Sequence, residues 1–356
     1  MRIIENKRYC EMLCRLYEDF PHWDWLNGKT VLLSGATGMI GSFLTDTVML
    51  RNRQTGLACR IIALGRNRKA AEERFSLWMG QPDFAFLEHD ICDPLPSLPW
   101  EPDYFIHAAS TTHPRAYASE PVNTILANIL GTRNLLESAV KSEKSRFLLL
   151  SSVEIYGENR GDTEYFREDY CGYIDCNTLR AGYPEGKRVS EALCQAYRQQ
   201  YGTEAVVLRL PRCYGPTMRM SDSKAIAQFI KRAAAGEEIV LKSEGNQLYS
   251  YAHTADAVLG ILWVLLCGED GQAYNLGDPA SDLTLKQLAE LAAGCAGTRV
   301  IFDLPDELER RGYSTATRAL MDSARLRALG WHANYSIQQG ISETVRILQE
   351  MCQFPQ

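Results

Sequence analysis

Short runs of apolar residues alternate with longer amphipathic stretches along the first two thirds of the chain. The apolar runs have the length of buried strands, and the stretches between most of them have helical periodicity. Because helices that join consecutive parallel strands cover both faces of a sheet, this alternation predicts an α/β fold with a doubly wound parallel sheet. The predicted strands cover residues 31–34, 60–64, 84–87, 104–107, 147–151 and 205–210.

The pattern differs at the two ends of the chain. Apolar residues recur at helical spacing through residues 1–20, which predicts an amphipathic helix that packs against the main body. After residue 211 the rhythm loosens into loops and short helices, as is typical of a smaller lobe. We therefore predict an N-terminal helical extension over residues 1–28, a sheet domain over 29–211, and a smaller lobe over 212–356, part of which returns to the sheet.

Composition and charge exclude several classes of protein. The net charge is -6, so the chain lacks the basic surface of a nucleic-acid-binding protein. The longest apolar run, residues 257–267, is too short to span a bilayer and predicts a buried helix, and the charged residues within 1–20 do not fit a signal peptide. The eleven cysteines include no C-x-x-C pair, which argues against a metal site. We therefore expect a cytoplasmic protein with neither membrane nor nucleic-acid partners.

A glycine-rich loop follows the first predicted strand. Gly35, Gly38 and Gly41 lie between that strand and a helical pattern that begins at Ser42. Glycines here permit a tight turn and a close backbone approach to a pyrophosphate, which the following helix N-terminus faces. The loop therefore predicts a dinucleotide site on a Rossmann sheet. Its candidate contacts are Gly35, Thr37, Gly38, Met39, Ile40 and Gly41.

The G-x-x-G-x-x-G spacing resembles that of the short-chain dehydrogenases/reductases, and three later segments agree with their extended type. Asp90 and Ile91 follow the third strand, where that family contacts adenine. Ala108 and Ala109 follow the fourth strand, beside the cofactor in that family. Residues 128–132 resemble the family's Asn-containing helix motif.

A tyrosine and a lysine lie four residues apart in Tyr183-Pro184-Glu185-Gly186-Lys187, so both face the same side of a helix. The pKa of a free tyrosine is near 10. A nearby ammonium and the positive nicotinamide ring favour the phenolate, which lets Tyr183 take a proton from a sugar hydroxyl. We expect Lys187 also to hold the nicotinamide ribose. The resemblance adds Ser152, at the end of the fifth strand, as the hydroxyl that orients the substrate.

Within the extended family, the sequence most resembles UDP-glucuronate decarboxylases of the NAD-dependent epimerase/dehydratase group. The segments that carry this resemblance are residues 107–114, 168–170, 182–191 and 214–216, and dehydratases of nucleotide sugars also share the pattern of residues 152–157, so the type is decarboxylase, epimerase or dehydratase. The decarboxylase resemblance is the strongest. It implies transient C4 oxidation of a nucleotide-linked sugar, with UDP as the nucleotide, and a homodimer that pairs through the helix bearing Tyr183. Glu154 matches an acid beside the sugar's C5, where it can remove or return a proton because a 4-keto group acidifies that carbon.

Two positions depart from the decarboxylase pattern. Tyr249 stands where those enzymes carry an arginine, and Arg212 stands where they carry an asparagine. We predict that Arg212 supplies the positive charge that Tyr249 cannot, because its fork can bind a diphosphate or a carboxylate. Both residues are therefore candidate substrate contacts.

The choice of cofactor is open between NAD and NADP. An NAD enzyme usually has an acid at the end of the second strand, whereas this chain has Gly65-Arg66, and Arg66 can accept a 2′-phosphate, which favours NADP slightly. Two rival functions follow. One is an NADPH-dependent reductase of a keto-sugar or another carbonyl. The other is a non-catalytic dinucleotide sensor, which the presence of Ser152, Tyr183 and Lys187 disfavours.

Overall fold

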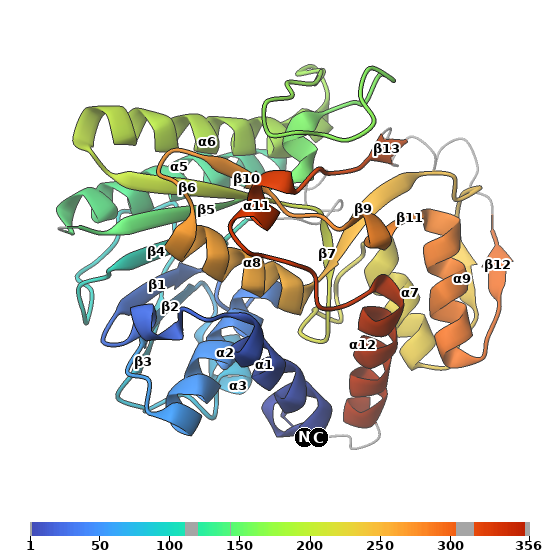
Figure 1. Cartoon of the computed structure of the whole chain (residues 1–356), viewed down its shortest axis with the longest axis horizontal. Helices are drawn as coiled ribbons and strands as arrows, with labels where there is room; N and C mark the ends of the chain where they lie inside the picture. Colours follow the sequence, from blue (N-terminus) through green and yellow to red (C-terminus); the bar gives the residue numbers. More distant parts are fainter. Residues whose placement is uncertain (1, 111–119, 143, 304–316, 353–356) are drawn as a thin grey trace.

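The computed structural model describes residues 2–110, 120–142, 144–303 and 317–352. A seven-stranded parallel sheet forms the centre of the molecule, in the order β10-β6-β5-β4-β1-β2-β3 (Figure 1). This finding confirms the predicted α/β class. The strands are β1 (Thr30–Ser34), β2 (Arg60–Gly65), β3 (Phe84–Glu88), β4 (Tyr104–His107), β5 (Arg146–Ser152), β6 (Glu204–Leu210) and β10 (Ala273–Asn275).

Helices cover both faces of this sheet, which explains why its strands are apolar on both sides. On one face, α5 (Pro121–Lys141) and α6 (Gly182–Tyr201) pack on one set of alternating strand residues, among them Leu32 and Phe105. On the other face, α2 (Met39–Thr55) and α8 (Thr254–Cys267) pack on the intervening set, among them Leu33 and Ile106. The apolar run at residues 257–267 is thus a buried helix, as predicted.

The N-terminal segment comprises η1 (Ile3–Glu5), α1 (Lys7–Asp19) and η2 (Trp23–Leu26), and α1 packs against α2 and α8, the helices that cover the second face. Tyr9 of α1 donates a hydrogen bond of 2.7 Å to the fully buried Asp46 of α2. Asp46 also accepts a 2.8 Å hydrogen bond from Trp78 and pairs with Arg74 of α3 (Arg68–Arg74). Buried charges are stable only when they are paired in this way, so α1 completes a polar network of the sheet body.

The predicted start of the helix after the glycine loop is wrong by three residues. Helix α2 begins at Met39 rather than Ser42, because Gly38 takes the N-cap position with an extended backbone. Gly41 therefore lies in the first helical turn. A β-carbon there would come within 2.5 Å of the Gly35 carbonyl oxygen, so only glycine fits.

A C-terminal lobe stands beside the carboxyl ends of the strands (Figure 1). It holds a four-stranded sheet of β7 (Arg212–Tyr214), β9 (Leu248–His253), β11 (Asp282–Thr284) and β13 (Arg318–Ala319), and a two-stranded sheet of β8 (Ile239–Leu241) and β12 (Val300–Phe302). Its helices are α7 (Ala225–Ala234), α9 (Leu285–Ala296) and α12 (Ile337–Cys352), while η5 (Pro279–Ser281) and α11 (Ala324–Ala328) lie in the connections. None of the helices in the described ranges is long and apolar enough to cross a membrane.

Candidate active site

One large cleft, of about 1800 Å³, lies between the carboxyl ends of the sheet and the C-terminal lobe. All the candidate site residues named from the sequence line this cleft. Carboxyl ends of parallel strands are the usual ligand site of doubly wound sheets. Residues 111–114 of the segment that resembles the decarboxylases lie outside the described residues.

The glycine loop is built as a dinucleotide cradle requires. Gly35 has a positive φ of 70°, and a β-carbon there would lie 2.7 Å from the Ala109 nitrogen. The loop therefore packs directly on the segment after β4, where Ala108 also lines the cleft. The start of α2 points its free N–H groups toward the cleft, a fitting environment for a pyrophosphate. These residues thus fit a nicotinamide dinucleotide.

The other predicted cofactor contacts lie at the next strands of the sheet. Arg66 follows β2, and its Nη1 lies 3.9 Å from Oδ2 of Asp90, which follows β3. Ile91 is buried, and its carbonyl accepts a 2.9 Å hydrogen bond from the Asn134 side chain of α5. A β-carbon at Gly131 of α5 would lie 2.4 Å from the Ile91 side chain, so glycine lets Ile91 pack against α5 where it lines the cleft.

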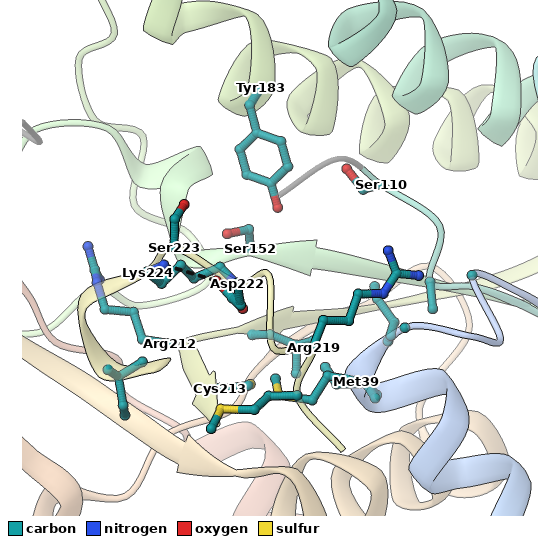
Figure 2. A pocket seen from close by; sticks show the side chains of 18 of the residues that line it. Met39, Ser110, Ser152, Tyr183, Arg212, Cys213, Arg219, Asp222, Ser223 and Lys224 are labelled. Carbon is teal, nitrogen blue, oxygen red and sulfur yellow. Dashed lines mark hydrogen bonds and ion pairs between the residues drawn. The ribbon is translucent and has the colours of Figure 1, made fainter. Parts of the chain in front are cut away.

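The Tyr183 side chain points toward Ser152, and both residues line the cleft (Figure 2). Burial raises the pKa of Tyr183, while a hydrogen bond with the Ser152 hydroxyl lowers it in part. Lys187 is not among the groups that shift the pKa of Tyr183. Among the protein's own groups burial outweighs the charges near the phenol, so the joint effect predicted for the ammonium and the nicotinamide ring stays a prediction.

Lys187 is fully buried, and its Nζ donates a 2.8 Å hydrogen bond to the Leu150 carbonyl of β5. Burial lowers the pKa of Lys187 to about 8. The side chain is thus fixed along the end of β5, and its remaining N–H groups are available to ligand hydroxyls in the cleft.

Glu154 lies between two arginines. It sits on η3 (Val153–Tyr156), where the Ser152 hydroxyl accepts a 3.2 Å hydrogen bond from the Glu154 N–H. Its Oε1 lies 3.7 Å from Nη2 of Arg212, and its Oε2 lies 4.0 Å from Nη2 of Arg180. Arg180 was not among the residues predicted from the sequence; it belongs to η4 (Leu179–Ala181), just before Tyr183. Its place three residues before that tyrosine is the only sequence signal it carries.

Arg212 and Tyr249, the two departures from the decarboxylase pattern, are in direct contact. The guanidinium carbon of Arg212 lies 3.4 Å from the centroid of the Tyr249 ring. One guanidinium nitrogen of Arg212, Nη1, is buried without a hydrogen-bond partner among the described residues. The stack orients this guanidinium, which leaves donors available to an anion in the cleft.

A second contact that the sequence analysis missed crosses the cleft at the glycine loop. Arg219, in the loop after β7, donates from Nη2 to the Thr37 hydroxyl at 3.3 Å and to the Thr37 carbonyl at 3.4 Å. Thr217 of the same loop donates a 2.7 Å hydrogen bond to the Met39 carbonyl. Nothing in the local sequence pattern indicates these contacts, because the partners lie about 180 residues apart.

This parallel sheet, its glycine cradle and the Ser152–Tyr183 pair beside Lys187 define a dinucleotide-dependent enzyme of the short-chain dehydrogenase class. The chain belongs to the NAD dependent epimerase/dehydratase family, whose model matches residues 31–277. This membership confirms the family expected from the sequence.

Individual proteins of known identity are similar to this chain in sequence or in fold. The chain is 30% identical to UDP-glucuronic acid decarboxylase 1 of Xenopus tropicalis over 321 residues, which cover 89% of this chain and 71% of the relative. Its fold matches UDP-glucose 4-epimerase of Thermotoga maritima, solved with UDP-glucose, with a TM-score of 0.76, 22% identity, and coverage of 91% of this chain and 99% of that chain. It also matches UDP-glucuronic acid 4-epimerase of Bacillus cereus, solved with UDP-glucuronic acid and NAD, with a TM-score of 0.74, 19% identity, and coverage of 90% and 99%.

Proposed function

We propose that the protein remodels a UDP-linked sugar acid by transient oxidation of C4, with the overall outcome of a decarboxylase or an epimerase. The observation that carries this proposal is the placement of Glu154, between Arg180 and Arg212, beside the Ser152–Tyr183 pair. In this proposal residues 29–211 hold the dinucleotide, and residues 212–356 mostly hold the nucleotide sugar, although β10 joins the central sheet.

The protein's own groups account for the proton transfers. The glycine loop and Lys187 would hold a nicotinamide dinucleotide, which would supply the hydride acceptor for C4 and the hydride for its later reduction. Tyr183 accepts the proton of the C4 hydroxyl, and Ser152 orients that hydroxyl. The resulting ketone acidifies C5, so the carboxyl group on C5 can leave as carbon dioxide, and the enolate that remains takes a proton at C5 from Glu154 or from water. In the epimerase outcome the carboxyl group stays, and the ketone turns in the cleft so that the hydride returns to its other face. Tyr183 then returns its proton to the C4 oxygen as the ketone is reduced.

The charges around Glu154 favour an anionic sugar. Two guanidiniums flank a single carboxylate at distances longer than a hydrogen bond, so part of their donor capacity is unused. A partly buried cation without a matching anion is costly, whereas a sugar carboxylate would restore the balance through charge-assisted hydrogen bonds. The relatives named as UDP-glucuronic acid decarboxylases support the same substrate class.

We favour NADP over NAD, since Arg66 follows β2 and glycine stands where an NAD enzyme usually has an acid. NAD is the alternative, because the structurally similar UDP-glucuronic acid 4-epimerase of Bacillus cereus was solved with NAD. An NADPH-dependent reductase of a keto-sugar is the second candidate function, because Arg66 favours NADPH in the same way.

We further propose that the protein forms a homodimer through α5 and α6. Exposed apolar side chains gather on these two adjacent helices, where Val140, Val189 and Tyr201 are between 40% and 54% exposed. An apolar surface of this kind is typical of an interface. Val189→Glu should shift the sedimentation coefficient to that of a monomer, whereas Arg299→Gln, an exposed position in the other lobe, should leave the dimer intact.

A proton NMR time course with UDP-glucuronate in deuterated buffer, with NAD and NADP each supplied, tests the function. Formation of UDP-xylose, with deuterium at C5, would establish decarboxylation. A C4-inverted acid without loss of carbon dioxide would establish epimerisation. Steady net consumption of NADPH with a keto-sugar would instead support the reductase. No reaction with any nucleotide sugar would refute the proposal.

A further inference from the structure

The end of β2 is the part of a dinucleotide-binding sheet that selects between adenosine riboses with and without a 2′-phosphate. In this chain the position is Gly65, where a β-carbon would lie 3.2 Å from the Phe86 ring and 3.7 Å from the Thr37 hydroxyl oxygen. The packing of Phe86 thus disfavours a side chain at Gly65. Position 65 therefore carries no acid to bind the ribose hydroxyls, and the nearby carboxylates of Glu88 and Asp90 face Arg68 and Arg66.

Arg219 brings a positive charge from the other lobe to this same point. Its Nη2 lies 3.3 Å from the Thr37 hydroxyl, the group that borders the Gly65 position. Figure 2 shows the Arg219 side chain extended across the cleft from the loop that follows β7. The 2.7 Å hydrogen bond from Thr217 to the Met39 carbonyl fixes that loop against the start of α2.

The neighbouring charges determine which arginines are available to an anion. Arg74 is paired with the buried Asp46, and Arg68 lies 3.6 Å from Glu88. Arg66 is more exposed than Arg74 and Arg68, since 72% of its side chain is accessible, and its only ion pair is a long 3.9 Å contact to Asp90 among the described residues. Arg66 and Arg219 can therefore reorient toward a ligand at a smaller cost than Arg74, which would leave a buried carboxylate unpaired.

We propose that Arg219 and Arg66 together bind a phosphate on the adenosine ribose, so that a residue of the substrate lobe selects NADP. This inference rests on the proposed function only in that a dinucleotide occupies the cleft. Two arginines suit a phosphate because each can donate paired hydrogen bonds to its oxygens. The contact also joins the two lobes across the bound cofactor.

Binding of NADPH and NADH, followed by fluorescence titration of the purified protein freed of dinucleotide, tests the proposal. The wild type should bind NADPH more tightly. Arg219→Gln should weaken the binding of NADPH by about 10- to 100-fold and the binding of NADH much less, as expected for lost charge-assisted hydrogen bonds. Arg66→Gln should act in the same direction, and Arg219→Lys should retain part of the preference. Arg299→Gln, a surface arginine paired with Glu238 outside the cleft, is the matched control.

Equal losses for NADPH and NADH would overturn the proposal, because Arg219 would then act on a part common to both dinucleotides. A wild type that prefers NADH, or an Arg219→Gln protein with unchanged selectivity, would overturn it as well. If Arg219→Gln does not fold, calorimetry on the wild type with adenosine 2′,5′-bisphosphate and with AMP decides the question, since the proposal requires the bisphosphate to bind more tightly. Failure of the wild type to bind any dinucleotide would instead refute the proposed function.

Discussion

The guanidinium of Arg212 stacks on the ring of Tyr249, 3.4 Å from its centroid, and also faces Glu154. Arg212 stands where the decarboxylase pattern has an asparagine, and Tyr249 stands where it has an arginine. Relative to that pattern, the positive charge lies on β7 instead of β9. The stack explains how an arginine at the new position keeps a fixed orientation, since the aromatic face holds the guanidinium plane.

Replacement of Arg212 should weaken substrate binding. Arg212→Ala removes the donors aimed into the cleft, so we expect the dissociation constant for UDP-glucuronate to rise at least tenfold, about the value of one charge-assisted hydrogen bond. Isothermal titration calorimetry measures this effect. Arg212→Lys keeps the charge but loses the fork and the stack, so it should recover only part of the affinity. Unchanged binding by Arg212→Ala would refute the role.

Tyr183→Phe should abolish proton transfer while leaving the cleft intact. We expect the rate of nicotinamide reduction on mixing with substrate to fall by about 10²- to 10⁴-fold, the usual contribution of a general base. Ser152→Ala should cause a smaller loss, because it removes hydrogen bonds to the phenol and to the Glu154 N–H and the group that orients the C4 hydroxyl, but leaves the proposed base itself in place. Stopped-flow absorbance follows the reaction, and dinucleotide titration verifies that the site remains formed. A Tyr183→Phe protein with near wild-type rates would show that another group is the base.

Tyr9→Phe should destabilise the protein although Tyr9 lies far from the cleft. The substitution leaves the buried Asp46 with one hydrogen bond fewer, and we expect a loss of about 1–3 kcal/mol in the free energy of unfolding. Tyr17→Phe, on the same helix, is the control, because Tyr17 donates to the neutral Thr47 carbonyl and should cost less. Urea denaturation compares the two variants. Equal losses would mean that the charge on Asp46 is unimportant.

Asp256 should make stability depend on pH. Burial raises the pKa of Asp256 to about 7, although the backbone N–H of Asn334, at 2.8 Å, opposes this shift. In the unfolded chain the pKa is about 3.9. The native state thus binds a proton that the unfolded state releases, so this contribution to stability is complete below about pH 4 and is lost as the pH rises through about 7.

Asp256→Asn tests that dependence, since an amide still accepts the Asn334 hydrogen bond but does not titrate. Urea unfolding at a series of pH values should show that the free energy of unfolding changes less between pH 4 and 7 in the variant than in the wild type. Parallel pH profiles would contradict the assignment.

Local sequence patterns determined much of this protein. Apolar runs placed six strands of the central sheet, because burial on both faces requires an uninterrupted apolar strand. The glycines at 35, 38 and 41 predicted the dinucleotide loop, since only that residue type permits its turn and close packing. Tyr183 and Lys187 could be paired because they lie one helical turn apart.

Only the tertiary structure decided the contacts between distant segments. Glu154, Arg180 and Arg212 come from three separate elements, and Arg219 meets Thr37 from the opposite lobe. The pKa of Tyr183 depends on how completely the cleft buries the phenol, which no spacing reveals. Periodicity records which face of an element is buried, but the partner on that face depends on how the whole chain folds. For this reason most of the candidate site residues could be proposed one by one from the sequence, whereas Arg180, Arg219 and the arrangement around Glu154 came from the fold.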